Sequence, residues 1–342
     1  MSLGNSNVFD QELKKKNILN LNVVDVGARN GIFFLPSWYC KISNLFGFEP
    51  NIIEYKKLIN KNTDAFKLGF YQPEFKNTKY FNAAIWKKKT KKKLYITKSP
   101  GAITLVGKAI KKVAKNLSRE SKFKENYYTD VQKIIKTKMI NCNTIDNIFF
   151  KKKIIIDFLK LDVEGGEYNC LVGANKILKK KGVLVIKTEF LLSPYYNNTK
   201  ILGYLSVYLN KFKYRLIYLD FKQSKYSWKQ TNFNNFNDTK LIYAGDAYFI
   251  LDPDLNKLNK EKLLRMGITL IALGFFSTGI NFIKESKNIS QELLNNILKL
   301  CKKEKKYLFY EYWINAPLKI LNLLRFIKYF FINILQLFKF KN

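Results

Sequence analysis

The residues best suited to chemistry lie in the stretch LKLDVEGGEYNCLVGA, where a lysine and two carboxylates precede a pair of glycines. Lys160, Asp162 and Glu164 alternate along the end of an apolar run, so a strand would place all three on one face. Three charges on one face of a core strand are costly unless they have partners or a function. The alternative interpretation is an internal ion pair that only orders the turn. Because the carboxyl ends of parallel strands border the ligand crevice of α/β proteins, we expect a site here.

Another glycine turn, in VVDVGARNG, lies earlier in the chain and separates the possible ligand classes. We call it the first turn and the turn after LKLDV the second turn. Asp25, Gly27 and Gly31 follow an apolar run. The dinucleotide fingerprint G-x-G-x-x-G needs glycine where this chain has Arg29, and the P-loop pattern is absent. A carboxylate at this turn repels a pyrophosphate but attracts an ammonium or sulfonium group, and S-adenosylmethionine carries both. Glu49 ends the next apolar run and could accept both ribose hydroxyls, a feature that dinucleotide and adenosylmethionine sites share. The alternative is that the glycines merely turn a strand into a helix.

Several stretches together resemble the FkbM family of S-adenosylmethionine-dependent methyltransferases. They are VVDVGARNG, GFEPN, NAAIW, NTIDNIF and IDFLKLDVEGGEYNCLVGA, and the resemblance covers roughly residues 20–252. The block LKLDVEG-E with a downstream GA is the most specific part, whereas DVGARNG is general to class I methyltransferases. The resemblance implies O-methylation, often of sugars in glycans or glycolipids.

The resemblance also implies roles for single residues. The first turn would lie along the methionine part of the cofactor, Glu49 would hold the ribose, and Asn82 would border the adenine. Asp162, Glu164 and Glu189 would face the transfer site. The residues implied to bind the cofactor are Asp25, Gly27, Asn30, Gly31, Glu49 and Asn82.

Methyl transfer to a hydroxyl needs an aligned acceptor oxygen and a base for its proton. The chain has no histidine, so the base must be another group. Neighbouring acids raise each other's pKa, and we therefore expect Asp162 as the base, Glu164 as the second choice and Lys160 as the electrostatic partner. We predict no metal, although Asp162, Glu164 and Glu189 together offer the oxygen ligands that Mg²⁺ prefers.

Strand patterns that alternate with helix patterns predict a doubly wound α/β sheet with helices on both faces, of the Rossmann-like class I methyltransferase type. Strands are expected in residues 21–26, 44–50, 79–86, 182–190, 214–220 and 246–252 and in IIIDFLKL, and helices in NIIEYKKLIN and near 201–210. From about residue 255 the pattern is wholly helical. We therefore predict a methyltransferase domain over residues 1–253 and a helical region over residues 254–342.

A basic insertion is predicted at about residues 87–138, which hold 17 basic and 3 acidic residues. It begins with WKKKTKKKLYIT, which alternates like a hairpin with a lysine-rich tip, and a basic helix-like run follows from Val106. The family motifs cover neither this insertion nor the helical region after residue 253.

The composition argues against a nucleic-acid reader, which remains the main alternative. Lys plus Arg number 61 against 26 acids, a formal net charge of +35, but only five are arginines. Proteins that recognise nucleic-acid sequences depend on the paired hydrogen bonds of the arginine guanidinium. We therefore expect mainly a solvated lysine surface and no specific binding of nucleic acid. The chain also lacks the Asn/Asp-Pro-Pro-aromatic motif of amino-methylating enzymes after DFLKL, and no cysteine follows a proline. A nicotinamide oxidoreductase is less favoured still, because the middle glycine is missing.

The cysteines and the amino terminus favour a reducing compartment. The four cysteines form no CxxC pair, which argues against zinc and against a disulfide framework. The first residues lack the pattern of a secretion signal, so we expect a cytoplasmic protein. The oligomeric state is left open.

Two segments near the carboxyl terminus bear on membranes. Residues 266–283 hold 18 uncharged residues, but glycines, hydroxyl residues and Asn281 interrupt them, so we predict a helical hairpin that turns near Gly274–Gly279. Residues 317–342 predict an amphipathic helix with five basic residues and no acid. This tail either docks on the sheet domain or lies on an anionic membrane, where it would be near a lipid-linked acceptor.

Overall fold

The computed structural model describes residues 20–70, 72–111, 113, 130–197, 199–223, 242–287, 295–297 and 299. The chain divides into two compact units. Residues Asp10–Asn288 form one, and Met1–Phe9 with Ile289–Asn342 form the other. The helices and strands below belong to the first unit.

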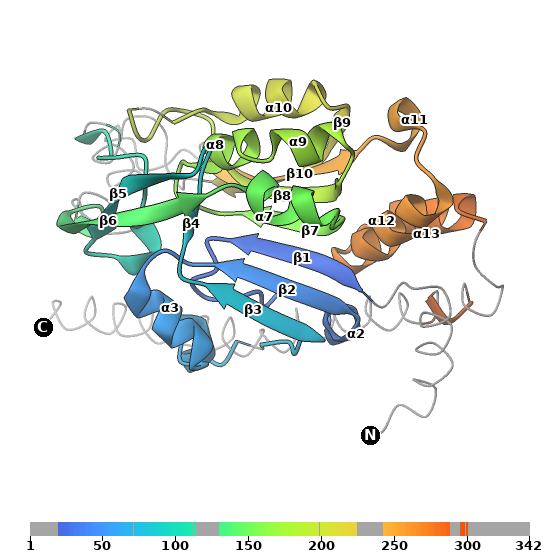
Figure 1. The fold of residues 1–342 in the computed structure, drawn as a ribbon, viewed down its shortest axis with the longest axis horizontal. Coiled ribbons are helices and arrows are strands. Elements are labelled where there is room, and N and C mark those ends of the chain that lie inside the picture. Colours follow the sequence, from blue (N-terminus) through green and yellow to red (C-terminus); the bar gives the residue numbers. More distant parts are fainter. Residues whose placement is uncertain are drawn as a thin grey trace, which may run out of the picture. The chain divides into compact units, whose positions relative to one another are not determined.

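A seven-stranded sheet forms the centre of this unit (Figure 1), with the strand order β3-β2-β1-β7-β8-β10-β9. Neighbouring strands are parallel except for β10, which is antiparallel to both β8 and β9. This sheet confirms the predicted fold class. The strands are β1 Leu21–Val26, β2 Ser43–Phe48, β3 Asn77–Phe81, β7 Ile156–Leu161, β8 Val183–Leu191, β9 Tyr214–Gln223 and β10 Ile242–Leu251.

The strand order reverses between β1 and β7, and this reversal positions the site. From β1 the chain builds outward through β2 and β3, then returns to place β7 on the other side of β1. In an open α/β sheet, ligands bind outside the carboxyl ends of the strands at such a reversal. Asp25 of β1 pairs in register with Lys160 of β7 at this point, so both predicted turns leave the sheet side by side.

Helices cover both faces of the sheet. Figure 1 shows α8, α9 and α10 on one side and α3 on the other. The predicted helices in NIIEYKKLIN and near residues 201–210 are confirmed as α3 and α10. The helices that precede residue 253 are α2 Ser37–Lys41, α3 Ile52–Ile59, α4 Asp64–Lys67, α7 Ile145–Phe149, α8 Glu167–Val172, α9 Asn175–Lys179 and α10 Leu202–Asn210.

A second sheet of three strands holds the ends of the basic insertion, in the order β4-β6-β5. Its strands are β4 Ala84–Ile85, β5 Thr90–Thr97 and β6 Ile134–Asn143. The predicted hairpin in WKKKTKKKLYIT is therefore wrong, because β5 pairs with β6 far along the chain. The expected strand at 79–86 also divides, since β3 and β4 belong to different sheets. Most of the helix-like run that follows Val106 lies outside the described residues.

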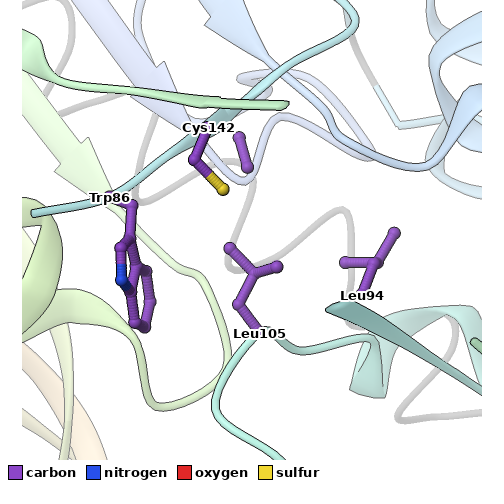
Figure 2. Packing of buried hydrophobic residues seen from close by; sticks show 5 residues of the cluster. Trp86, Leu94, Leu105 and Cys142 are labelled. Atoms are coloured by element: carbon purple, nitrogen blue, oxygen red, sulfur yellow. The ribbon is translucent and has the colours of Figure 1, made fainter. Parts of the chain in front are cut away.

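A small hydrophobic core explains this pairing. Figure 2 shows Trp86, Leu94, Leu105 and Cys142 packed together, and each of them is buried. Leu94 lies on β5 and Cys142 lies on β6, so the two strands bury their apolar residues by pairing with each other. A hairpin made within Trp86–Thr97 would leave Leu94 without Leu105 and Cys142.

The sheet ends at Leu251, and a helical hairpin follows. Its helices are α12 Lys260–Ala272 and α13 Phe276–Glu285, which come after the short α11 Pro253–Asn256. This confirms the predicted hairpin, although its turn lies slightly earlier than expected, with Gly274 at φ +88°. A Cβ on Gly267 would lie 2.7 Å from the carbonyl oxygen of Gly279, so the two helices cross where neither has a side chain. None of the described helices has the length and apolar character needed to cross a membrane.

Helix α12 is tied to the sheet by a buried ion pair. Arg265 contacts Asp157 of β7 through two hydrogen bonds, Nε to Oδ1 at 2.8 Å and Nη2 to Oδ2 at 2.6 Å. The hydroxyls of Tyr39 and Thr269 lie 3.0 Å apart. The compact unit thus continues past residue 253, and the division into two domains there stays a prediction. The tail at residues 317–342 lies outside the described residues.

Candidate active site

The two predicted glycine turns lie against each other. Gly27 has φ +88°, and a Cβ there would lie 1.8 Å from the main-chain oxygen of Asp162. The backbone N–H of Asp162 also donates to the carbonyl of Val26 at 3.0 Å. Glycine at position 27 therefore lets the turn after β1 approach the turn after β7.

Asp25 and Lys160 form a buried pair beneath these turns. The Nζ of Lys160 lies 3.0 Å from Oδ1 of Asp25 and 3.3 Å from Oδ2 of Asp162. Burial raises the pKa of Asp25, and Lys160 opposes that rise. Burial alone would lower the pKa of Lys160, but the two carboxylates raise it above its ordinary value. Lys160 therefore stays a cation and links the first turn to the second.

Asp162 and Glu164 both lie beyond the strand, which corrects the expectation that β7 carries all three charged residues. The strand ends at Leu161, and Glu164 has φ +54° in the turn that follows. This conformation is uncommon for a residue other than glycine, and such strain is concentrated at functional sites. The hydroxyl of Thr104 donates to the carbonyl of Glu164 at 2.7 Å, and the hydroxyl of Tyr196 donates to its carboxylate at 3.2 Å.

The basic insertion supplies part of this support, which the sequence did not indicate. Thr104 comes from the insertion, as does Gln132, whose amide donates to the hydroxyl of Tyr196 at 3.4 Å. Tyr196 follows β8 in the stretch SPYY and is almost completely buried. Burial raises the pKa of Tyr196, so its hydroxyl stays protonated as a donor to Glu164.

The three predicted acids at the transfer site come together. Carboxylate oxygens of Asp162, Glu164 and Glu189 all lie within 4.8 Å of one another. Such a set can share a divalent cation or can take up a proton, because one charge raises the pKa of the next. In the same turn, the carboxylate of Glu167 accepts hydrogen bonds from the backbone N–H groups of Val163 at 2.9 Å and Gly165 at 3.3 Å. Burial, and then the charge of Glu189, raise the pKa of Glu167 to about 8.

A row of acids extends from this cluster across the sheet. Glu189 of β8 pairs in register with Asp246 of β10, which pairs with Asp220 of β9. Asp162 follows Leu161, which pairs with Thr188, so Asp162 lies beside Glu189. Cross-strand partners share a face, and the row therefore lies on one side of the sheet. The sequence did not indicate it, because the register of β8, β9 and β10 is a tertiary property.

Lys187 lies on β8 two residues before Glu189, on the same face as this row, and contacts both acid and aromatic groups. Its Nζ lies 2.9 Å from Oδ2 of Asp246 and 5.1 Å from the ring centre of Phe34. Phe34, which follows the first turn, is 38% exposed. We call the part of the sheet that carries this row of acids the transfer edge. It offers a partly exposed aromatic face next to a line of carboxylates.

Glu49 lies at the end of β2, as predicted. Its carboxylate is nearly buried and accepts a hydrogen bond from the backbone N–H of Asn51 at 2.7 Å. Burial raises the pKa of Glu49 to about 7. The amide of Asn82 donates to the carbonyls of Glu49 at 2.9 Å and Pro50 at 3.1 Å, so it holds the turn that carries Glu49. A contact of Asn82 with an adenine stays a prediction.

The sheet, with an acid and a glycine turn after its first strand, agrees with the predicted class I methyltransferase fold. The chain belongs to the FkbM family: the profile described as Methyltransferase FkbM domain matches residues 25–216, more than half of the chain. The predicted family is therefore confirmed, and with it the methyltransferase class and S-adenosylmethionine as the cofactor. The role of each site residue stays a prediction.

Two solved structures show a weaker similarity. One is magnesium protoporphyrin IX methyltransferase (ChlM) from Synechocystis PCC 6803 with bound SAM, with 9% identity, 72% of this chain and 77% of that chain covered, and a TM-score of 0.31. The other is TYW2 from M. jannaschii in complex with AdoMet, with 14% identity, 70% and 76% covered, and a TM-score of 0.26. Both scores are too low to support an argument about this chain. No curated protein matches its sequence.

The first turn fits the amino-acid part of S-adenosylmethionine. Three buried polar atoms near it have no hydrogen-bond partner in the described part of the protein: Oδ2 of Asp25, Oδ1 of Asn30 and Nε2 of Gln72. A Cβ on Gly31 would lie 3.0 Å from Oε1 of Gln72, so this amide borders the glycine turn. The cofactor carries an ammonium donor and a carboxylate acceptor, which complement two acceptors and one donor. Gln72 lacks a sequence motif, and the sequence therefore did not indicate it.

Proposed function

We propose that this methyltransferase acts on a hydroxyl group of a sugar in a glycan or glycolipid. The observation that carries the proposal is the cluster of Asp162, Glu164 and Glu189 beside the cofactor turn. A hydroxyl must lose its proton as it attacks, and a carboxylate is the available base in a chain that has no histidine. The family resemblance supports the same reaction.

Asp162 is the base that we assign. Its backbone contacts Gly27, and its side chain is 44% exposed, so it borders both the cofactor and the solvent. S-adenosylmethionine would supply the methyl group to the acceptor oxygen and would leave as S-adenosylhomocysteine, and the carboxylate of Asp162 would accept the acceptor's proton. Lys160 contacts Asp25 and Asp162 and keeps the two turns aligned. Glu164, which Tyr196 holds in place, is the second candidate for the base.

The charge at the transfer edge supports a neutral acceptor. Seven of the chain's 26 acids lie at this edge, and the lysines among them are Lys160 and Lys187. A phosphate-rich acceptor would be repelled by those of these acids that are ionised, whereas sugar hydroxyls can donate to carboxylates. The acids of the edge are Asp25, Asp162, Glu164, Glu167, Glu189, Asp220 and Asp246.

Methylation of a nucleic acid is the competing proposal, and the net charge of +35 favours it. A cytosine C5 reaction would need an accessible thiolate. The cysteines in the described ranges, Cys40, Cys142 and Cys170, are all buried, and burial raises the pKa of each thiol. These thiols are therefore poor nucleophiles.

The test is a transfer assay with methyl-labelled S-adenosylmethionine and separate cell fractions of glycans, glycolipids, RNA and protein. We expect label in the glycan or glycolipid fraction with the wild-type chain, and almost none with Asp162→Asn. Label that enters RNA, with the same loss in the variant, would overturn the sugar acceptor while leaving the site intact.

A further inference from the structure

An apolar loop protrudes next to the cofactor turn. Helix α4 ends at Lys67, and the chain continues through Leu68, Gly69 and Phe70. Gly69 has φ +77°, and a Cβ there would meet nothing within 4 Å, so the loop projects into open space. Leu68 is 76% exposed, and Phe66 and Phe70 are each 49% exposed. We call residues 66–70 the Phe66 loop.

The Phe66 loop packs against the residues that follow the first glycine turn. The rings of Phe70 and Phe33 lie 5.2 Å apart between centres, and Phe33 and Phe34 are 39% and 38% exposed. Exposed aromatic and aliphatic residues thus extend from the Phe66 loop to the turn that borders the cofactor. Contiguous exposed apolar surface of this kind marks an interaction site.

The exposed charges of residues 52–70 are positive. Lys56, Lys61 and Lys67 are exposed. The acids of the same segment are already neutralised, because Arg29 binds both Glu54 and Asp64 and Lys57 contacts Glu54 at 2.8 Å. The exposed charge of residues 52–70 is therefore basic, and it complements an anionic surface.

We propose that the Phe66 loop docks the protein on an anionic lipid bilayer. Phenylalanine and leucine side chains enter the interface between headgroups and acyl chains, while the surrounding lysines contact anionic headgroups. A nucleic acid explains the lysines and could stack on phenylalanine, but it offers no partner for Leu68, the most exposed of these apolar residues. The proposal does not depend on which acceptor is methylated.

Docking here would bring the cofactor edge next to the membrane. Phe33 and Phe34 come two and three residues after Gly31, and Phe34 contacts Lys187 beside the row of acids. A membrane under the Phe66 loop would therefore lie beside the mouth of the transfer site. The Phe66 loop and residues 317–342 are different parts of the sequence, and the membrane contact of residues 317–342 stays a prediction.

The test is co-sedimentation of the full chain with vesicles of phosphatidylcholine mixed with phosphatidylglycerol. We expect Leu68→Glu to lower the bound-to-free ratio at least about tenfold, because an apolar side chain is lost and a negative charge is added. Val207→Glu is the matched control, since Val207 is 65% exposed on α10 and the charge change is the same. Phe66→Ser combined with Leu68→Ser should weaken binding without a change in charge. Thermal melting shows that each variant is folded.

Several outcomes would overturn the proposal. Equal loss of binding in Leu68→Glu and Val207→Glu would contradict it, as would binding of the wild-type chain to RNA but not to vesicles. Loss of binding only in a chain that ends at Ala316 would assign the contact to the tail. A wild-type dimer that Leu68→Glu dissociates would assign the surface to self-association. Each of these results is independent of the acceptor assay.

Discussion

Single residues connect the two turns of the candidate site. Lys160 contacts Asp25, which precedes the first turn, and Asp162, which begins the second turn. The alternation of charged residues in LKLDVEG predicted that Lys160 and Asp162 share a face, and the structure agrees. Glu164 was misplaced, because a left-handed residue ends the alternation and no sequence rule requires one there.

Asp162→Asn should separate turnover from cofactor binding. Loss of a general base is expected to lower turnover on the order of 10²–10⁴-fold. Affinity for S-adenosylhomocysteine, measured by calorimetry, should change little, because the backbone contact with Gly27 remains. Asp254→Asn makes the same change at an exposed position far along the chain and should leave both quantities unchanged. Near-normal turnover of Asp162→Asn would move the role of base to Glu164 or Glu189.

Glu49 should make cofactor binding depend on pH. Burial raises its pKa to about 7, and ribose hydroxyls donate to the ionised carboxylate, so binding favours loss of the proton. We expect affinity for S-adenosylhomocysteine to increase as the pH rises through 7, with proton release that calorimetry in two buffers can detect. Glu49→Gln should bind about 1–3 kcal/mol more weakly at high pH and lose this dependence.

The same shift affects stability without the cofactor. The pKa of Glu49 is higher in the folded chain than its ordinary value of 4.5, so the folded state holds the proton longer. Its contribution to the free energy of unfolding should fall as the pH rises from 4.5 to about 7. Denaturant unfolding of the wild type and Glu49→Gln measures this difference. A pH-independent difference, together with pH-independent binding, would mean that Glu49 is ionised throughout.

Gln72 should contribute to binding of the amino-acid part of the cofactor. Its Nε2 is buried without a partner in the described residues, and a hydrogen bond to a charged carboxylate contributes about 1.5–3 kcal/mol. Gln72→Leu should therefore weaken S-adenosylhomocysteine but leave 5′-methylthioadenosine, which has no amino-acid group, unaffected. Equal weakening of both ligands in calorimetry would show a general disturbance of the turn.

The elements differ in how far the sequence could predict them. The strands of the large sheet were predictable, because β1 and β7 are almost entirely buried and read as continuous apolar runs. The pairing of β5 was not predictable, since its alternation suits a local hairpin as well as a partner far along the chain. The row of acids was hidden for a similar reason, because it exists only in the register of four strands.

Arg265 should be important for stability because it ties α12 to β7. It is buried against Asp157, and removal of one partner from a buried pair leaves a buried charge. We expect Arg265→Leu to lower the free energy of unfolding by about 3–5 kcal/mol in urea. Lys98→Leu is the control: it removes a pair with Asp130 in which both side chains are 63% exposed, and it should cost about 1 kcal/mol or less. Equal effects would mean that α12 is not held by this pair.

The whole molecule combines a basic surface with an acidic reaction edge. A formal net charge of +35 draws the protein to anionic surfaces, but the acids at the carboxyl ends of the strands disfavour an anionic acceptor in the site itself. Composition alone could predict the basic surface. The acidic edge depends on how the fold gathers residues that are far apart in the sequence.

Transfer to a sugar hydroxyl is tested most directly by locating the methyl group in the product. Product formed from methyl-labelled S-adenosylmethionine and the accepted fraction is hydrolysed, and the labelled component is identified by mass spectrometry. We predict an O-methyl sugar whose methyl ether survives mild base, and its absence when Asp162→Asn replaces the wild type. Label recovered as a base-labile methyl ester, as a methylated nucleobase or as a methylated amino acid would contradict the proposed function.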